Sequence, residues 1–169
     1  MEWVAIVGSW RNVTNEIEQD VRRKTKEIID LGMGIVTGGA LGVDYLAIHE
    51  AIRLDMFADR IKIILPTNLD TYEKHYRKRA SEGIITNRQA SQLIQQLRNI
   101  KSKNPKAVKE LRYAAVNKSS YYRRNSKIID VADKIIAFQV NKSEGTQDTI
   151  DKANTRKIPV ELHEYSMKR

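Results

Sequence analysis

The amino-acid sequence predicts an α/β fold whose central sheet is mainly parallel. Short apolar runs rich in Val and Ile alternate with amphipathic stretches that have helical spacing. Such alternation favours parallel strands joined by helical crossovers. No apolar run approaches the roughly 20 residues that a membrane span requires. A chain of 169 residues fits one domain, and we expect a single domain over residues 1–169.

The first predicted strand, "WVAIVG" (residues 3–8), is β-branched, apolar and closed by a glycine, as buried parallel strands often are. A helix follows, capped by Thr14 or Asn15 and running to Leu31. Asn15 stands three residues before Glu18, which is the spacing of a capping box. This segment therefore predicts one strand and one amphipathic helix.

The next segment repeats this order. "GIVTGG" (residues 34–39) predicts a strand with a glycine turn, and residues 43–55 predict a helix. "IKIILP" (residues 61–66) predicts a third strand, closed by a proline that cannot donate to a sheet ladder. These segments supply the second and third strands of the predicted sheet.

The remainder of the chain begins with a basic region, residues 70–122, that predicts two or three helices with a polar break at Pro105. A strand follows at residues 133–138, then a loop and helix over residues 141–157. The last strand is expected in "IPVELHEY" (residues 158–165). The predicted fold is thus a mainly parallel sheet with a basic helical insertion.

Positive charge is concentrated in one part of the chain. The net charge is +9, yet residues 71–125 hold 14 basic and three acidic side chains. One interpretation is a solvated helical surface, and the other is a contact surface for a polyanion such as nucleic acid. The candidate nucleic-acid patch consists of Lys74, Arg77, Lys78, Arg79, Arg88 and Arg123.

Three predicted strand ends carry glycine beside polar residues: "GSWR", "TGGALGVD" and "KSEGTQDT". Ligands of open α/β sheets bind outside the carboxyl ends of the strands, and helix-start amides attract anions. Alternatively, each glycine could be present because a tight turn requires it, without any role in ligand binding. Neither GxGxxG nor a Walker A motif is present, so NAD and ATP sites have no direct support. We expect no metal site, because His75 and His163 lack ligand-like neighbours and cysteine is absent.

Four stretches together resemble the DprA/Smf and LOG (SLOG) superfamily of Rossmann-type proteins: "VAIVGSWR", "VTGGALGVDYLAIHEA", "YRRNSKIIDVADKIIAF" and "KSEGTQDTIDKA". The superfamily pattern is G-S-R, then G-G-A-x-G-(I/V)-D-x-x-A-H, then R-N before a strand, and a final G-T or G-S turn. The resemblance covers landmarks from Val4 to about Val160. It implies a Rossmann-like, doubly wound sheet and a crevice for nucleotides or nucleic acid, with no cofactor beyond a bound nucleotide or phosphate.

The resemblance also implies a set of ligand-binding residues. Trp10 stands where the superfamily has the arginine of G-S-R, and Arg11 follows it. The residues expected to hold the phosphate-bearing ligand are Gly8, Ser9, Arg11, Gly38, Gly39, Ala40, Gly42, Asp44, Arg124, Asn125, Gly145 and Thr146.

The superfamily has two functional branches. LOG-type enzymes cleave the N-glycosidic bond of nucleoside monophosphates with a glutamate whose position here is Thr149, so we expect no catalytic residues. DprA-type proteins bind single-stranded DNA, and the "EGTQDT" loop is closer to theirs.

We therefore expect a non-enzymatic, DprA-like binder of single-stranded DNA, cytoplasmic and homodimeric, without a membrane association. A nucleotide-processing enzyme, such as a glycosidic hydrolase or deoxyribosyltransferase, and a nucleotide sensor remain alternatives. Tyrosines in the basic region could stack on bases or pack at helix edges. They are Tyr72, Tyr76, Tyr113, Tyr121 and Tyr122.

Overall fold

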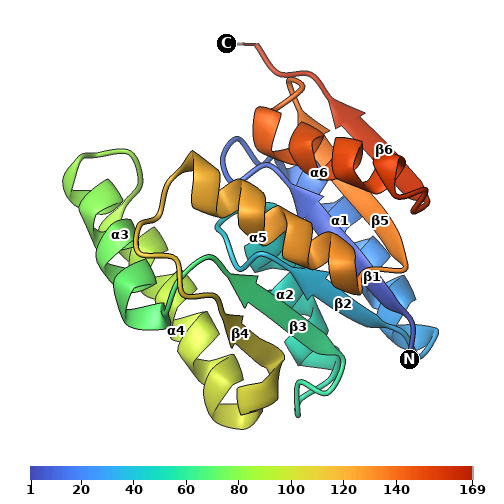
Figure 1. The fold of residues 1–169 in the computed structure, drawn as a ribbon, viewed down its shortest axis with the longest axis horizontal. Helices are drawn as coiled ribbons and strands as arrows, with labels where there is room; N and C mark the ends of the chain where they lie inside the picture. The colour runs from blue at the N-terminus through green and yellow to red at the C-terminus, as the bar shows by residue number, and fades with distance from the viewer. Residues whose placement is uncertain (169) are drawn as a thin grey trace.

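Six strands form one sheet in the order β4-β3-β2-β1-β5-β6, as Figure 1 shows for the computed structural model, which describes residues 1–168. Every neighbouring pair is parallel, so the sheet is parallel throughout rather than mainly parallel. The strands are β1 (Trp3–Gly8), β2 (Gly34–Thr37), β3 (Ile61–Leu65), β4 (Val108–Glu110), β5 (Lys134–Val140) and β6 (Val160–Tyr165).

Helices connect the strands and cover both faces of the sheet (Figure 1). The connections are α1 (Asn15–Asp30), α2 (Val43–Leu54), α3 (Leu69–Ser81), α4 (Asn87–Lys103), the short 3₁₀ turn η1 (Pro105–Ala107), α5 (Lys118–Val131) and α6 (Glu144–Thr155). Within residues 1–168, no helix is both long and apolar enough to cross a bilayer.

The strand order reverses beside β1. The chain proceeds from β1 through β2 and β3 to β4 at one edge, and then α5 returns it across the sheet to β5 on the other side of β1. This confirms the doubly wound, Rossmann-like architecture. It also places the topological switch point between β1 and β5, where such sheets bind ligands.

Alternate strand residues face opposite layers. Ile6, Ile35 and Ile63 belong to the core cluster that also contains side chains of α1, α2 and α4. Val7 and Val36 belong to the other cluster, which contains side chains of α5 and α6. Burial on both faces explains why these strands are nearly continuous apolar runs in the sequence.

The basic region contains a strand that the sequence pattern did not indicate. After α4 and η1, residues 108–110 form β4 and pair with β3, Val108 opposite Ile63. With only three residues, of which Lys109 and Glu110 are charged, β4 lacks the apolar run that predicted β1, β2, β3 and β5. The region is thus two helices and an edge strand, followed by the start of α5.

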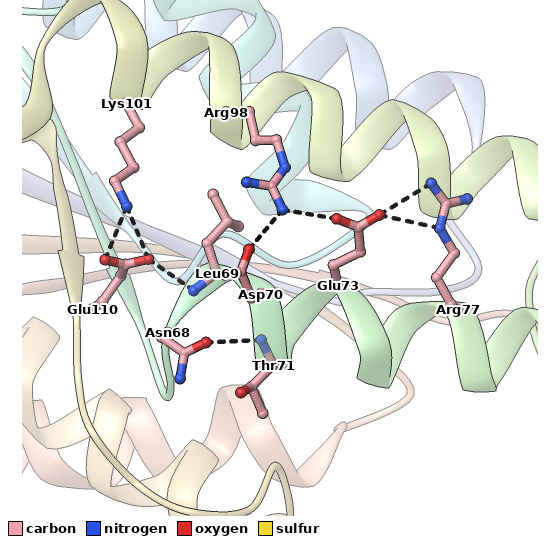
Figure 2. A network of polar contacts seen from close by, with 9 residues as sticks. All are labelled: Asn68, Leu69, Asp70, Thr71, Glu73, Arg77, Arg98, Lys101 and Glu110. Atoms are coloured by element: carbon pink, nitrogen blue, oxygen red, sulfur yellow. Dashed lines mark hydrogen bonds and ion pairs between the residues drawn. The ribbon is translucent and has the colours of Figure 1, made fainter.

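Ion pairs join α3 to α4 (Figure 2). The guanidinium of Arg98 donates to Asp70 at 3.1 Å and to Glu73 at 2.8 Å. Glu73 also accepts from Arg77 at 3.4 Å, and Arg77 donates to Ser91 of α4 at 2.7 Å. Isolated surface pairs contribute little to stability, but this network holds the two helices in register.

Strand β4 in turn holds the start of α3 (Figure 2). The Glu110 carboxylate accepts the backbone N–H of Leu69 at 2.7 Å and pairs with Lys101 at 3.1 Å. The Asn68 side chain accepts from the N–H of Thr71 at 2.8 Å and caps the helix. The orientation of α3 therefore depends on contacts with β4.

The sequence offered two alternative caps for helix α1, Thr14 and Asn15. Thr14 is the cap, and its side chain accepts from the N–H of Ile17 at 3.3 Å. The capping box proposed for Asn15 and Glu18 does not form, because Asn15 is already the first helical residue.

Replacing Glu110 by alanine removes the acceptor of the Leu69 N–H and the partner of Lys101. We expect a loss of about 1–2 kcal/mol in the free energy of unfolding, measured by urea denaturation. The matched control is Glu164→Ala on β6, an exposed residue without an ion pair in residues 1–168, which should change stability by less than about 0.5 kcal/mol. Equal effects of the two substitutions would contradict the role assigned to Glu110.

Candidate functional site

A pocket of about 720 Å³ opens at the carboxyl ends of β1, β2 and β5. Its walls come from the loop after β1, the turn after β2, the start of α6, the inner side of α5 and one side of α3. This is the switch point of the sheet. The pocket lining includes ten of the predicted ligand residues: Gly8, Ser9, Arg11, Gly38, Ala40, Asp44, Arg124, Asn125, Gly145 and Thr146.

The other two predicted ligand residues, Gly39 and Gly42, do not line the pocket. A Cβ on Gly42 would lie 2.3 Å from the carbonyl oxygen of Ser9, and a Cβ on Gly39 would lie 2.7 Å from Leu65 Cδ2. Both glycines also have positive φ angles. Turn conformation and close packing therefore account for both glycines, and their role as ligand residues stays a prediction.

Gly145 has a different environment. A Cβ at this position would have nothing within 4 Å. It lies in the first turn of α6, whose cap residue Ser143 makes no side-chain bond to the helix amides and donates instead to Thr146 Oγ1 at 3.1 Å. Amides at a helix start that lack a capping side chain attract anions. This end of α6 is thus open to a ligand in the pocket.

Arg124 of α5 is held mainly by backbone. It is 7% exposed, and its Nη1 donates to the carbonyl of Gly38 and, at 3.4 Å, to that of Ile64. A Cβ on Gly38 would lie 2.5 Å from Arg124 Cζ, so the guanidinium occupies the space that a side chain would need. Arg124 therefore fixes the ends of β2 and β3 and adds a positive charge to the pocket wall.

Asp44 and Asn125 are also largely buried and positioned by hydrogen bonds. Asp44 accepts the N–H of Ala40 at 3.1 Å; burial raises the pKa of its carboxyl, and the nearby charge of Arg124 opposes that rise. Asn125 Nδ2 donates to Asp148 at 3.1 Å and to the carbonyl of Gly145 at 3.4 Å. Asn125 thereby ties α5 to the start of α6.

Helix α3 supplies a wall of the pocket. Sequence reasoning named Arg79 in the basic patch and Tyr76 as a stacking candidate, but it did not place this helix beside the strand ends. His75, Tyr76 and Arg79 line the pocket, and His75 Nε2 lies 3.3 Å from the hydroxyl of Tyr121 on α5. Burial, followed by the positive charge of Arg79, lowers the pKa of His75. No motif indicated this wall, because the position of α3 depends on its contacts with α4 and β4.

Two of the five tyrosines expose almost no ring surface for base stacking, although Tyr76 lines the pocket. Tyr72 and Tyr76 are buried, their rings pack edge to face, and Tyr72 donates to the carbonyl of Gly39 at 3.0 Å. Burial raises the pKa of both hydroxyls. Tyr121 and Tyr122 line the pocket, whereas Tyr113 lies outside it, 5.1 Å from the guanidinium of Arg123.

The six residues of the basic patch have different surroundings. Arg79 lines the pocket, and Arg77 is turned toward Glu73 and Ser91. The exposed members without an ion pair among residues 1–168 are Lys74, Lys78, Arg88 and Arg123. Lys74 and Lys78 lie one helical turn apart beside the His75–Arg79 wall, so they extend the positive surface outward from the pocket.

Thr149, at the position of the LOG-type glutamate, is buried in the pocket wall, where its hydroxyl donates to the carbonyl of Gly145 at 3.4 Å. The nearby carboxylate of Glu144 is exposed and pairs with Lys118 at 3.2 Å. No group of three or more His, Asp or Glu side chains that could hold a metal ion occurs in residues 1–168.

Comparison with known proteins relates this chain to one family. The family model described as DNA recombination-mediator protein A matches residues 1–168. No curated protein sequence matches the chain significantly.

Two solved structures share the fold. DNA processing protein A from Helicobacter pylori, whose single-stranded DNA binding mode is known, has a TM-score of 0.70 and 23% identity over 95% of this chain and 64% of its own. DprA from Streptococcus pneumoniae has a TM-score of 0.50 and 16% identity over 96% of this chain and 58% of its own. The chain therefore spans less than two thirds of either protein.

Alanine substitutions at two pocket glycines should have opposite effects on stability. Gly38→Ala forces a methyl group against the Arg124 guanidinium, and we expect a loss of about 1–3 kcal/mol in unfolding free energy. Gly145→Ala meets open space in a helix, and we expect no loss or a gain of up to about 1 kcal/mol. Thermal and urea denaturation of the two variants measure this contrast, and a destabilised Gly145→Ala would contradict it.

Proposed function

Because the chain belongs to the DNA recombination-mediator protein A family, we propose that it binds single-stranded DNA in the pocket at the switch point, without catalysing a reaction. The observation that carries this proposal is Gly145, an open glycine at the start of a helix that no side chain caps in residues 1–168. It faces a pocket bordered by cations and aromatic rings. Phosphate and base therefore each have a suitable partner there.

The phosphate is expected at the start of α6. Backbone amides and the positive end of the helix dipole favour an anion at this position. The absence of a side chain at Gly145 lets a phosphate approach the backbone closely. Arg11, Arg79 and Lys118 line the same pocket, and the buried charge of Arg124 adds to the field. Arg79 also pairs with Glu82 at 3.3 Å and Lys118 with Glu144 at 3.2 Å, so Arg11 is the one of these three without an ion pair in residues 1–168.

The bound DNA strand is expected to continue from the pocket over α3. Lys74 and Lys78 are exposed beside the pocket wall and pair with no acid in residues 1–168, so their charges are available to neighbouring phosphates. Arg77, on the same helix, is engaged by Glu73 and Ser91. Thus only some of the basic side chains in this region are available to bind a polyanion.

Fluorescence anisotropy with an oligothymidylate, titrated between about 50 and 200 mM salt, tests this proposal. We expect affinity to fall steeply with salt, and Lys78→Ala to weaken binding and reduce the log–log slope by about 0.7, one phosphate contact. Arg77→Ala is the matched control and should leave the slope unchanged. Absence of binding at low salt would overturn the proposal.

The enzymatic and sensor alternatives have distinct outcomes in companion assays. Release of free base from a nucleoside monophosphate, lost in Arg124→Ala, would replace the proposal with a hydrolase. Saturable nucleotide binding that raises the melting temperature without turnover, in the absence of DNA binding, would replace it with a sensor.

We further propose that residues 1–169 form one domain, that the chain assembles as a homodimer and that it acts in the cytoplasm. The absence of cysteine suits a reducing compartment. Light scattering measures the assembly, because a homodimer has twice the 19.5 kDa mass of this chain.

A further inference from the structure

The loop after β1 presents a tryptophan at the pocket. Trp10 lines the pocket and is 38% exposed, although an indole of this size is normally covered. The guanidinium carbon of Arg11 lies 4.3 Å from the centre of the Trp10 ring. The two side chains therefore form a stacked aromatic–cation pair on the wall of the candidate site.

The backbone under this pair is tightly held. Ser9 donates its N–H to the carbonyl of Phe138 at 3.2 Å, and its own carbonyl accepts from the N–H of Val43 at 3.0 Å. The Ser9 hydroxyl donates to the carbonyl of Arg11. A Cβ on Gly42 would lie 2.8 Å from Trp10 Cα, so that glycine lets the loop lie directly against the start of α2. The backbone that carries the indole is thus preorganised.

We propose that Trp10, backed by Arg11, is a stacking platform for a base of single-stranded DNA. This inference rests on the proposed function, because it assigns a base contact to the same pocket. An indole face offers no donor to a phosphate, whereas every base has a π-face that stacks on aromatic rings and guanidinium planes. Gly145 and Trp10 line one pocket, so the phosphates and the bases of a bound strand have partners on different walls.

The other tryptophan of the chain is a natural control. Trp3 begins β1, at the opposite end of the strand from the pocket, and does not line it. Its ring packs against the Lys62 ammonium at 4.0 Å and occupies the space where a Cβ on Gly34 would be. Because the chain has two tryptophans, Trp3→Phe leaves Trp10 as the single tryptophan reporter.

The test compares oligothymidylate with an abasic oligonucleotide of equal length, which keeps the phosphates and lacks the bases. In the Trp3→Phe protein, we expect thymidylate to quench Trp10 fluorescence and the abasic strand to leave it nearly unchanged. Trp10→Ala should lower affinity for thymidylate about tenfold or more, and leave affinity for the abasic strand unchanged. Trp10→Phe should retain most of the thymidylate affinity, and Trp3→Phe all of it.

Three other results are possible, and each would refute either base stacking by Trp10 or DNA binding itself. If Trp10→Ala binds thymidylate as tightly as the unmodified chain, stacking is refuted while DNA binding stands. If its affinity for both strands falls equally, Trp10 supports the loop rather than a base, and stacking is again refuted. If the unmodified chain binds neither strand, the proposed function fails and this inference fails with it.

Discussion

The guanidinium of Arg124 lies against the bare backbone of Gly38, and the arrangement of the pocket depends on this contact. Helix α5 carries the chain from the edge of the sheet back to β5, and Arg124 attaches that crossover to the ends of β2 and β3. The next residue, Asn125, binds the first turn of α6. Two adjacent side chains thus set the distance between the glycine turn after β2 and the open helix start after β5.

Sequence reasoning predicted most of this architecture, because its main signals are local. Four of the six strands, β1, β2, β3 and β5, are apolar runs, and the carboxyl ends of parallel strands necessarily meet at one edge of the sheet. Strand β4 was missed because it is short, charged and stabilised by pairing with β3. The wall formed by α3 was missed for a related reason, since Glu110 of β4 and Arg98 of α4 determine where that helix lies.

The glycines show clearly what a sequence motif cannot decide, namely which glycine serves a turn and which one faces a ligand. In the sequence, Gly38, Gly39, Gly42 and Gly145 all suit either a turn or a phosphate cradle. Three-dimensional neighbours separate them: Arg124 fills the space at Gly38, Leu65 and Ser9 crowd Gly39 and Gly42, and only Gly145 of these four has empty space. Composition also could not separate the basic residues that are free to bind a polyanion from those already in ion pairs. Arg77 and Lys78 are adjacent in sequence, yet of these two only Arg77 has an acidic partner in residues 1–168.

The central claim is that DNA lies at the carboxyl end of the sheet, with a phosphate at the start of α6. Amide NMR spectra recorded during titration with a short oligothymidylate test this claim most directly, because they report the position of the ligand residue by residue. The largest shifts are predicted for the amides of residues 144–146 and for the loop of residues 9–11. Binding that instead shifts residues 31–33 and 56–60, at the amino ends of the strands, and leaves residues 144–146 unchanged would contradict it.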